Sequence, residues 1–250
     1  MTALIRAEAR KLRTTRTFWL LAIGAFTLIA GGVTATAIAT TYTGPASPAR
    51  ATLALAGLAQ TFALLAGTLA VTGEYRHKTI SSAILITPRR TPLLAAKLIT
   101  LAAAGLVSGV VAMGAAAAIT LPVLASRHVA SGINGADLAG IIVGGGVATA
   151  LCAALGVGVG ALIRNQAGAV VTVLFLLYVA EPLLGFIPHV GAVIQQYGLG
   201  GLAAGTSGTT QYPAVTHLLS QVPAAAVLAA YATVALVAGA VLLRQRDITA

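Results

Sequence analysis

Long apolar runs separated by short polar segments dominate this sequence. The runs cover about residues 18–41, 52–73, 98–125, 138–163, 167–193 and 224–243, and the fifth is broken near residues 181–182. A helix needs about 20 residues to cross about 30 Å of hydrocarbon, and backbone groups in lipid must be paired within their own segment. The runs show no strand-like alternation. The pattern therefore predicts an all-α integral membrane protein with six transmembrane helices, forming a single domain over residues 1–250.

The composition supports a lipid environment and argues against a soluble protein. Apolar residues make up 58% of the chain and charged residues only 8%, whereas soluble domains carry about 25% charged residues. The net charge of +10 suggests nucleic acid at first sight, but the basic residues flank the apolar runs and do not form one face. We therefore expect membrane lipid, and no nucleic acid, around this chain.

The basic residues also predict which side of the membrane each segment faces. If the N-terminus lies inside, only Arg50 and Arg127 of the 15 basic residues fall in outer segments. Lys and Arg collect on the cytoplasmic side, and an even number of crossings returns the chain to that side. We expect a multi-pass protein of the cell membrane with both termini in the cytoplasm. The inner basic residues are Arg6, Arg10, Lys11, Arg13, Arg16, Arg76, Lys78, Arg89, Arg90, Lys97, Arg164, Arg244 and Arg246.

The segment before the first crossing has a helical pattern of its own. Ile5, Ala9 and Leu12 recur on one face, and three arginines recur on the neighbouring face. This predicts an amphipathic interfacial helix over residues 2–15, with its basic side toward anionic lipid. The alternative is inner positive charge without an ordered helix. A secretory signal peptide is disfavoured, because the first apolar run exceeds the usual core of about 7–15 residues.

The first inner loop carries the most informative motif. An acidic residue ends the second crossing, a Thr follows, and a short amphipathic stretch leads to a Pro-Arg-Arg turn before a Lys opens the third crossing. In this order the residues are Glu74, Thr79, Ser81–Ile86, Pro88, Arg89, Arg90 and Lys97. The motif and the six-crossing layout resemble the ABC-2-type (type V) family of ABC exporter permeases. One departure is Lys78, at a position where this family often has Gly.

The resemblance implies a function for the loop and two protein partners. In the family, the helix in this loop is a cytoplasmic coupling helix that fits a cleft on a separate ATPase subunit. The resemblance also implies a second permease copy or homologue. The coupling residues it implies are Glu74, Thr79, Ser81, Ile84, Leu85, Pro88, Arg89 and Arg90. The alternative is an ordinary basic loop in which Glu74 and Lys78 pair at i, i+4.

Absent motifs narrow the function further. The chain has no G-x-x-x-x-G-K-[ST] phosphate loop, so we expect ATP hydrolysis in the partner subunit and no enzyme activity in this chain. The lone Cys152 and the scattered His residues show no metal-ligand spacing, and we expect no metal or other cofactor. Two alternatives stay open: a secondary, ion-coupled carrier, and a membrane anchor that transports nothing. A carrier would be expected to keep several ionisable groups at membrane depth, where this chain offers Glu181.

The part of the fifth run before its break is short, and this predicts an outer gate. The 15 residues from Gln166 to Glu181 rise only about 22 Å, less than the hydrocarbon thickness of about 30 Å. Glu181 should therefore lie within the outer leaflet, and Pro182 interrupts helical hydrogen bonding directly after it. We expect a helix broken near residues 181–182, followed by a re-entrant outer segment in which Glu181 and Pro182 form the gate. The alternative is a helix that ends near Glu181 in a thinned bilayer.

Small residues at helical spacing predict where helices approach closely. Gly156, Gly158 and Gly160 lie inside the fourth run, without the strand and turn of a dinucleotide-binding loop. They are expected to let neighbouring backbones come near, as are the pairs Gly105/Gly109 and Gly140/Gly144.

Overall fold

The computed structural model describes all residues except 43–46, 77–89, 164, 210–217 and 246–250. The described part contains helices and no β-strand, and six spans are long and apolar enough to cross a membrane. The predicted all-α membrane protein with six crossings is therefore confirmed. The spans cover Arg16–Ala39, Pro48–Arg76, Pro92–Ser126, Gly135–Leu162, Gln166–Gly185 and Gln221–Leu242.

The N-terminal segment folds as a separate helix before the first crossing. Helix α1 (Thr2–Thr14) is joined to α2 (Arg16–Ala39) through Thr15, whose backbone is extended. The indole N–H of Trp19 donates to the backbone carbonyl of Arg13 at 2.9 Å, and so spans this joint. A helix thus forms over nearly all of residues 2–15, as the spacing predicts.

The second crossing contains a short irregular turn, and the third begins well before its apolar run. The second consists of α3 (Pro48–Leu53), a 3₁₀ turn η1 (Ala54–Gly57) and α4 (Leu58–Arg76). The third, α6 (Arg90–Ser126), starts eight residues before the predicted apolar boundary at residue 98. Helix α6 therefore brings several polar residues, Lys97 among them, into regular helical positions.

Helix α7 (Gly135–Leu162) is the centre of the bundle and packs against α4, α6 and α12 (Gln221–Gln245). Its glycines make these contacts close. A methyl group at Gly156 would collide with the carbonyl of Leu64 in α4, and one at Gly158 would collide with Ala235 in α12. Gly105 and Gly109 of α6 meet Thr149 of α7 in the same way. These contacts confirm the predicted close helix packing, in which absent side chains let backbones approach.

The fifth crossing is irregular, but its interruption differs from the predicted break. Helix α8 (Gln166–Phe175) passes into a π-helical turn, η2 (Leu176–Ala180), and then into α9 (Glu181–Gly185). The N–H of Glu181 donates to the carbonyl of Leu176, which is an i→i−5 bond. A wider turn at this point relieves the clash that Pro182 would cause in a regular α-helix. Helical backbone therefore continues past Glu181–Pro182 to Gly185.

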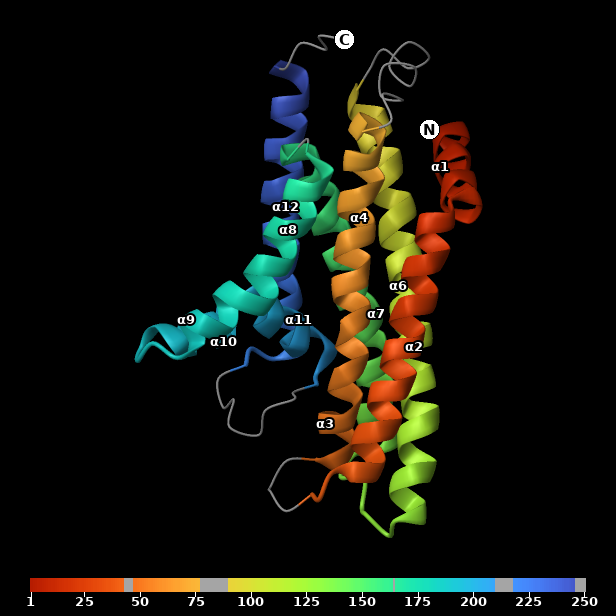
Figure 1. Ribbon diagram of the computed structural model, residues 1–250, viewed down its shortest axis with the longest axis vertical. Coiled ribbons are helices and arrows are strands. Elements are labelled where there is room, and N and C mark those ends of the chain that lie inside the picture. Colours follow the sequence, from red (N-terminus) through yellow and green to blue (C-terminus); the bar gives the residue numbers. More distant parts are fainter. Residues whose placement is uncertain (43–46, 77–89, 164, 210–217, 246–250) are drawn as a thin grey trace.

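The chain then returns to the bundle through two short helices. Helix α10 (Val190–Tyr197) is followed by α11 (Leu199–Ser207), which packs against α7 and α12. In Figure 1, α8 to α10 lead out of the bundle at a level between its two ends, and α11 comes back to it. The same view places α1 and the C-terminal part of α12 at one end of the bundle, and α3 toward the other.

Candidate functional site

The structure describes the two flanks of the predicted coupling loop. Glu74 lies in the last turn of α4, and Arg90 is the first residue of α6. Residues 77–89 of the loop lie outside the described residues, and these include Lys78, which would pair with Glu74 if the loop were an ordinary basic loop. The predicted coupling residues in this group are Thr79, Ser81, Ile84, Leu85, Pro88 and Arg89.

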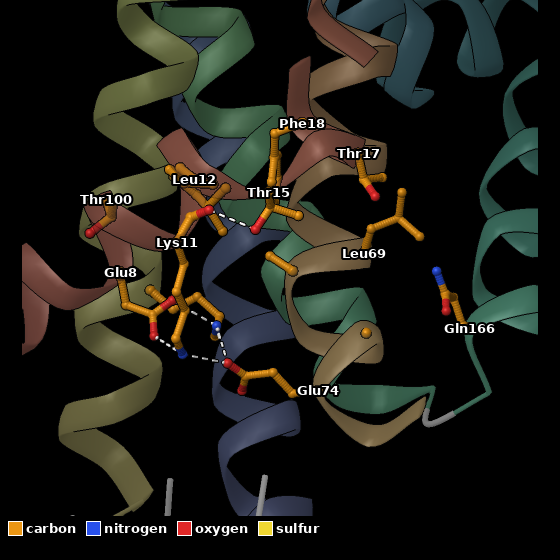
Figure 2. Close-up of a pocket in the computed structure, with 14 residues that line it drawn as sticks. Glu8, Lys11, Leu12, Thr15, Thr17, Phe18, Leu69, Glu74, Thr100 and Gln166 are labelled. Carbon is orange, nitrogen blue, oxygen red and sulfur yellow. Dashed lines mark hydrogen bonds and ion pairs between the residues drawn. The ribbon is translucent and has the colours of Figure 1, made fainter. Parts of the chain in front are cut away.

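Both flanks of the loop meet α1 in a ring of four charged side chains. The ammonium group of Lys11 donates to Glu8 Oε1 at 2.7 Å and to Glu74 Oε1 at 2.9 Å. The ammonium group of Lys97 donates to Glu8 Oε2 at 2.8 Å and to Glu74 Oε1 at 3.0 Å. Figure 2 shows Glu8 and Lys11 of α1 and Glu74 of α4 pointing toward one another. Acidic and basic groups alternate around the ring, so each charge has two opposite neighbours.

Most of the ring is shielded from solvent, so its charged groups depend on one another and not on water for stabilisation. The side chains of Lys97 and Glu8 are 5% and 8% exposed, and that of Lys11 is 50% exposed. Burial raises the pKa of the Glu8 carboxyl, but Lys97 and Lys11 outweigh it and hold that pKa below its ordinary value. Burial likewise opposes the charge of Lys11, yet its bonds to Glu8 and Glu74 raise its pKa. A charge removed from such a ring would leave its partners unpaired in a site with little water.

A cavity of about 370 Å³ lies beside the ring. Its walls combine apolar side chains, such as Phe18 and Leu69, with the charged groups and with Gln166 at the start of α8. In Figure 2, Gln166 stands across from Leu69 and away from the charged groups. The Gln166 side chain accepts a hydrogen bond from the guanidinium of Arg76 at 3.2 Å, which joins the end of α4 to the fifth crossing. The ends of the first, second, third and fifth crossings that lie near α1 thus meet around one cavity.

Sequence reasoning pointed to Glu74 and Lys97 but overlooked Glu8. A signal for Glu8 was present, because it shares the helical face of Ile5 and Leu12 and is the one acidic residue in the basic N-terminal segment. A carboxylate on an apolar helix face requires a partner when that face packs. The identity of the partner was hidden, since Lys97 is 89 residues away in the sequence.

Glu181 lies outside the ring and contacts helix α11. Its carboxylate accepts hydrogen bonds from the backbone N–H groups of Leu199 at 2.6 Å and Gly200 at 3.0 Å. These are the first two residues of α11, where N–H groups lack partners within the helix and the helix dipole favours a negative charge. Glu181 therefore binds the N-terminus of α11 from the neighbouring helix α9. Pro182 follows within the first turn of α9.

Arg50 holds the opposite end of α11. Its guanidinium donates to the carbonyl of Gly208 at 2.8 Å, just after the helix ends, and to Asp137 Oδ1 at 3.0 Å. Asp137 is fixed in turn by a capping box with Asn134 at the start of α7. A cation beside the terminal carbonyls of a helix is favourable. Helix α11 is thus held at both ends by charged side chains from other elements.

Arg127, the second basic residue expected outside, has a similar role. It donates to the carbonyls of Ala37 at 2.6 Å and Thr40 at 3.0 Å, at the C-terminal end of α2. Arg50 and Arg127, the two basic residues predicted to lie outside, therefore both bind carbonyl groups at the C-terminal end of a helix.

The fold and the site together describe a multi-pass membrane protein in which charged side chains join both flanks of the predicted coupling loop to α1. The model of a family described as "ABC-2 family transporter protein" matches residues 4–180. The chain therefore belongs to the ABC-2 transporter family, which confirms the resemblance found in the sequence motif, and we assign it as a permease of an ABC transporter. No curated protein matches the sequence. The family match ends one residue before Glu181, so α9 to α12 lie beyond it.

Proposed function

We propose that this chain is the membrane-spanning permease subunit of an ABC exporter, and that it moves a substrate outward with ATP hydrolysed by a separate ATPase subunit. The observation that carries this proposal is the charged ring at the base of the inner loop, in a chain of the ABC-2 family. The ring joins three helices around the segment to which an ATPase would bind. A loop that served only as a linker would need no such anchoring.

We place this end of the bundle, with both chain termini, in the cytoplasm of the cell membrane. The basic residues of α1 support this orientation, because Arg6, Arg10 and Arg13 are exposed beside the inner ring. Their exposed side suits anionic headgroups of the inner leaflet. The roles of Arg50 and Arg127 explain why two basic residues occur at the opposite end.

The orientation can be tested by cysteine labelling in a Cys152→Ala background. Ala130, in the exposed connection between α6 and α7, should react as a cysteine with an impermeant thiol reagent applied to intact cells. Ala3, exposed on α1, should react only after the membrane is permeabilised. Labelling of position 3 from outside would reverse the proposed topology.

The proposed assembly contains two permeases. Three crossings, α2, α12 and the segment α8 to α9, have much of their apolar surface uncovered, including Leu20 in α2, Val234 in α12 and Val171 in α8. Phe175 and Tyr178 extend the same exposed stretch. Lipid can cover such a surface, but a second permease copy or homologue would enclose a pathway between the two subunits. We therefore assign the uncovered helices to the dimer.

Helices α9 to α11 form the proposed outer gate. They leave the bundle and return to it between its two ends (Figure 1), which supports a re-entrant arrangement. Glu181 and Pro182 stand where this segment begins, and Glu181 binds the N-terminus of α11. Helices at membrane depth that do not cross the membrane, as proposed for α10 and α11, are tolerated when they are buried in protein or face water. A gate that separates a substrate pathway from the outside satisfies this condition.

The coupling role is tested by replacing Ile84 and Leu85 with Asp in one variant. Two charges in an apolar contact with the ATPase would each cost several kcal/mol. Export and co-purification of the ATPase should both fall, while membrane insertion is retained. Ala130→Asp, which adds an acidic residue at the opposite end, is the matched control and should bind the ATPase normally.

The outcome also separates the two alternative functions. Unchanged ATPase binding and export in the double variant would contradict the coupling role. Transport that follows an ion gradient and needs no ATPase would instead identify a secondary carrier. A protein that binds its partner without any transport would identify an anchor.

A further inference from the structure

We propose that Glu8 is a positioning residue for coupling: it fastens α1 to the two helix ends that flank the inner loop, so that the three elements move as one unit. This inference rests on the proposed function, because it assumes that an ATPase acts on that loop. It adds α1 to the coupling machinery, although the family motif lies entirely between Glu74 and Lys97.

The two carboxylate oxygens of Glu8 contact the two lysines of the ring. One carboxylate oxygen accepts from Lys97 of α6 at 2.8 Å, and the other accepts from Lys11 at 2.7 Å. Lys11 in turn reaches Glu74 of α4. A displacement of either loop flank by a few ångströms would therefore break a charged hydrogen bond or move α1 with it. Since broken bonds would leave charges unpaired in a buried site, common movement costs less.

Glu8 is a better candidate for this role than Lys11, the other α1 residue in the ring. Only 6% of Glu8 is exposed, and its face of the helix packs against α6. The side chain of Lys11 is half exposed, so water can replace the bonds that it loses. The attachment of α1 therefore depends chiefly on the bond between Glu8 and Lys97.

The protein contains a natural reporter of this attachment. Trp19 is the only tryptophan of the chain, and its indole N–H bonds to Arg13 across the joint between α1 and α2. More than half of its surface is exposed. A change in the angle between α1 and α2 would break this hydrogen bond and alter the solvent contact of the indole. Trp19 fluorescence therefore reports the position of α1 in the isolated permease.

The first experiment measures Trp19 emission and acrylamide quenching of the purified permease in lipid nanodiscs. Glu8→Gln keeps the side-chain size and removes its charge, so the emission should shift and the quenching should change relative to wild type. Arg10→Gln, which removes an exposed charge from the same helix, is the control and should match wild type. Identical spectra for wild type and Glu8→Gln would overturn the proposal.

The second experiment uses the complex with the ATPase. A fluorophore on Ala3→Cys in the Cys152→Ala background should respond when ATP and vanadate trap the closed ATPase. In Glu8→Gln this response should be lost while the ATPase stays bound. The double variant Glu8→Gln/Lys97→Gln should lose less than the sum of its two single variants, because neither buried partner is left charged alone.

The two experiments separate failure of the inference from failure of the proposed function. A full response in Glu8→Gln would contradict the role of Glu8, even if the wild-type complex is active. Strict additivity in the double variant would show that Glu8 and Lys97 do not act together, and would also contradict it. If the wild-type permease binds no ATPase, the proposed function fails, and the Trp19 measurement alone still decides whether Glu8 holds α1.

Discussion

The two ends of the bundle use charged residues in different ways. At the end that carries α1, Glu8, Lys11, Glu74 and Lys97 pair with one another in a buried ring. At the other end and around α11, charged side chains mainly bind backbone groups at helix termini, as Arg50 does at Gly208. A ring of side chains ties whole helices together, whereas single contacts at helix ends are weaker and more exposed. The first arrangement suits the proposed coupling to an ATPase, and the second suits the proposed outer gate.

The largest expected effect comes from breaking the ring of four charged side chains at Lys97. Lys97→Ala would leave Glu8 and Glu74 with Lys11 as their shared partner in a site where both carboxylates are mostly buried. Loss of one member of a buried ion pair typically costs about 3 kcal/mol. Thermal unfolding of the purified protein in detergent should therefore occur at a clearly lower temperature.

Lys11→Ala is the matched control for this prediction. It removes the same charge from the same ring, but its side chain is half exposed, and the expected cost is at most about 1 kcal/mol. Equal melting temperatures for the two variants would show that burial does not govern the strength of the ring.

A smaller effect is expected from releasing the ends of α11. Arg50→Gln should loosen its C-terminus, and Glu181→Gln should loosen its N-terminus, each by about 1 kcal/mol. The side chains of Arg50 and Asp137 are about one-third exposed, which limits the cost of losing their pair. Hydrogen exchange should become faster in α11 while the amides of α7 stay protected.

Arg127→Gln provides the control at the same end of the molecule. It removes a guanidinium that binds helix carbonyls, but those carbonyls belong to α2. Exchange in α11 should stay as in wild type. If Arg127→Gln loosened α11 as much as Arg50→Gln did, the contacts at the ends of α11 would not be what holds it.

The smallest expected effect is a change with pH at the ring of four charged side chains. The folded pKa of Glu8 lies below its ordinary value of 4.5, so its contribution to stability is present above that pH and is lost as the pH falls through the folded pKa. Lys11 behaves in the opposite way, because its raised pKa means that stability is lost only as the pH rises above 10.5. The other charged groups that face these two residues are Lys97, which pairs with Glu8, and Glu74, which pairs with Lys11. Trp19 emission should be constant at neutral pH and change in acid.

Glu8→Gln is the control for this titration. It lacks the carboxyl whose protonation would release α1, so the acid change in Trp19 emission should be smaller than in wild type. A change of equal size in the variant would assign the acid transition to another group.

Much of the fold could be predicted from the sequence, because lipid imposes simple conditions on length and polarity. Each of the six predicted crossings overlaps an observed span, and the packing role of Gly156 and Gly158 followed from their spacing. The detailed backbone of the fifth crossing was harder to predict. Its length and Pro182 indicated an irregular helix, but a π-helical turn depends on local hydrogen bonding that apolar patterning does not encode.

The sequence by itself determined that this protein spans a membrane, which family it belongs to, and where its charged residues are concentrated. Only the tertiary structure decided which charges meet. Lys97 pairs with Glu8 across 89 residues, and Arg50 reaches Gly208 across 158 residues. The physical reason is that hydrophobic length and charge asymmetry act segment by segment, whereas an ion pair depends on distances of about 3 Å between side chains of separate helices. Those distances exist only after the helices have packed.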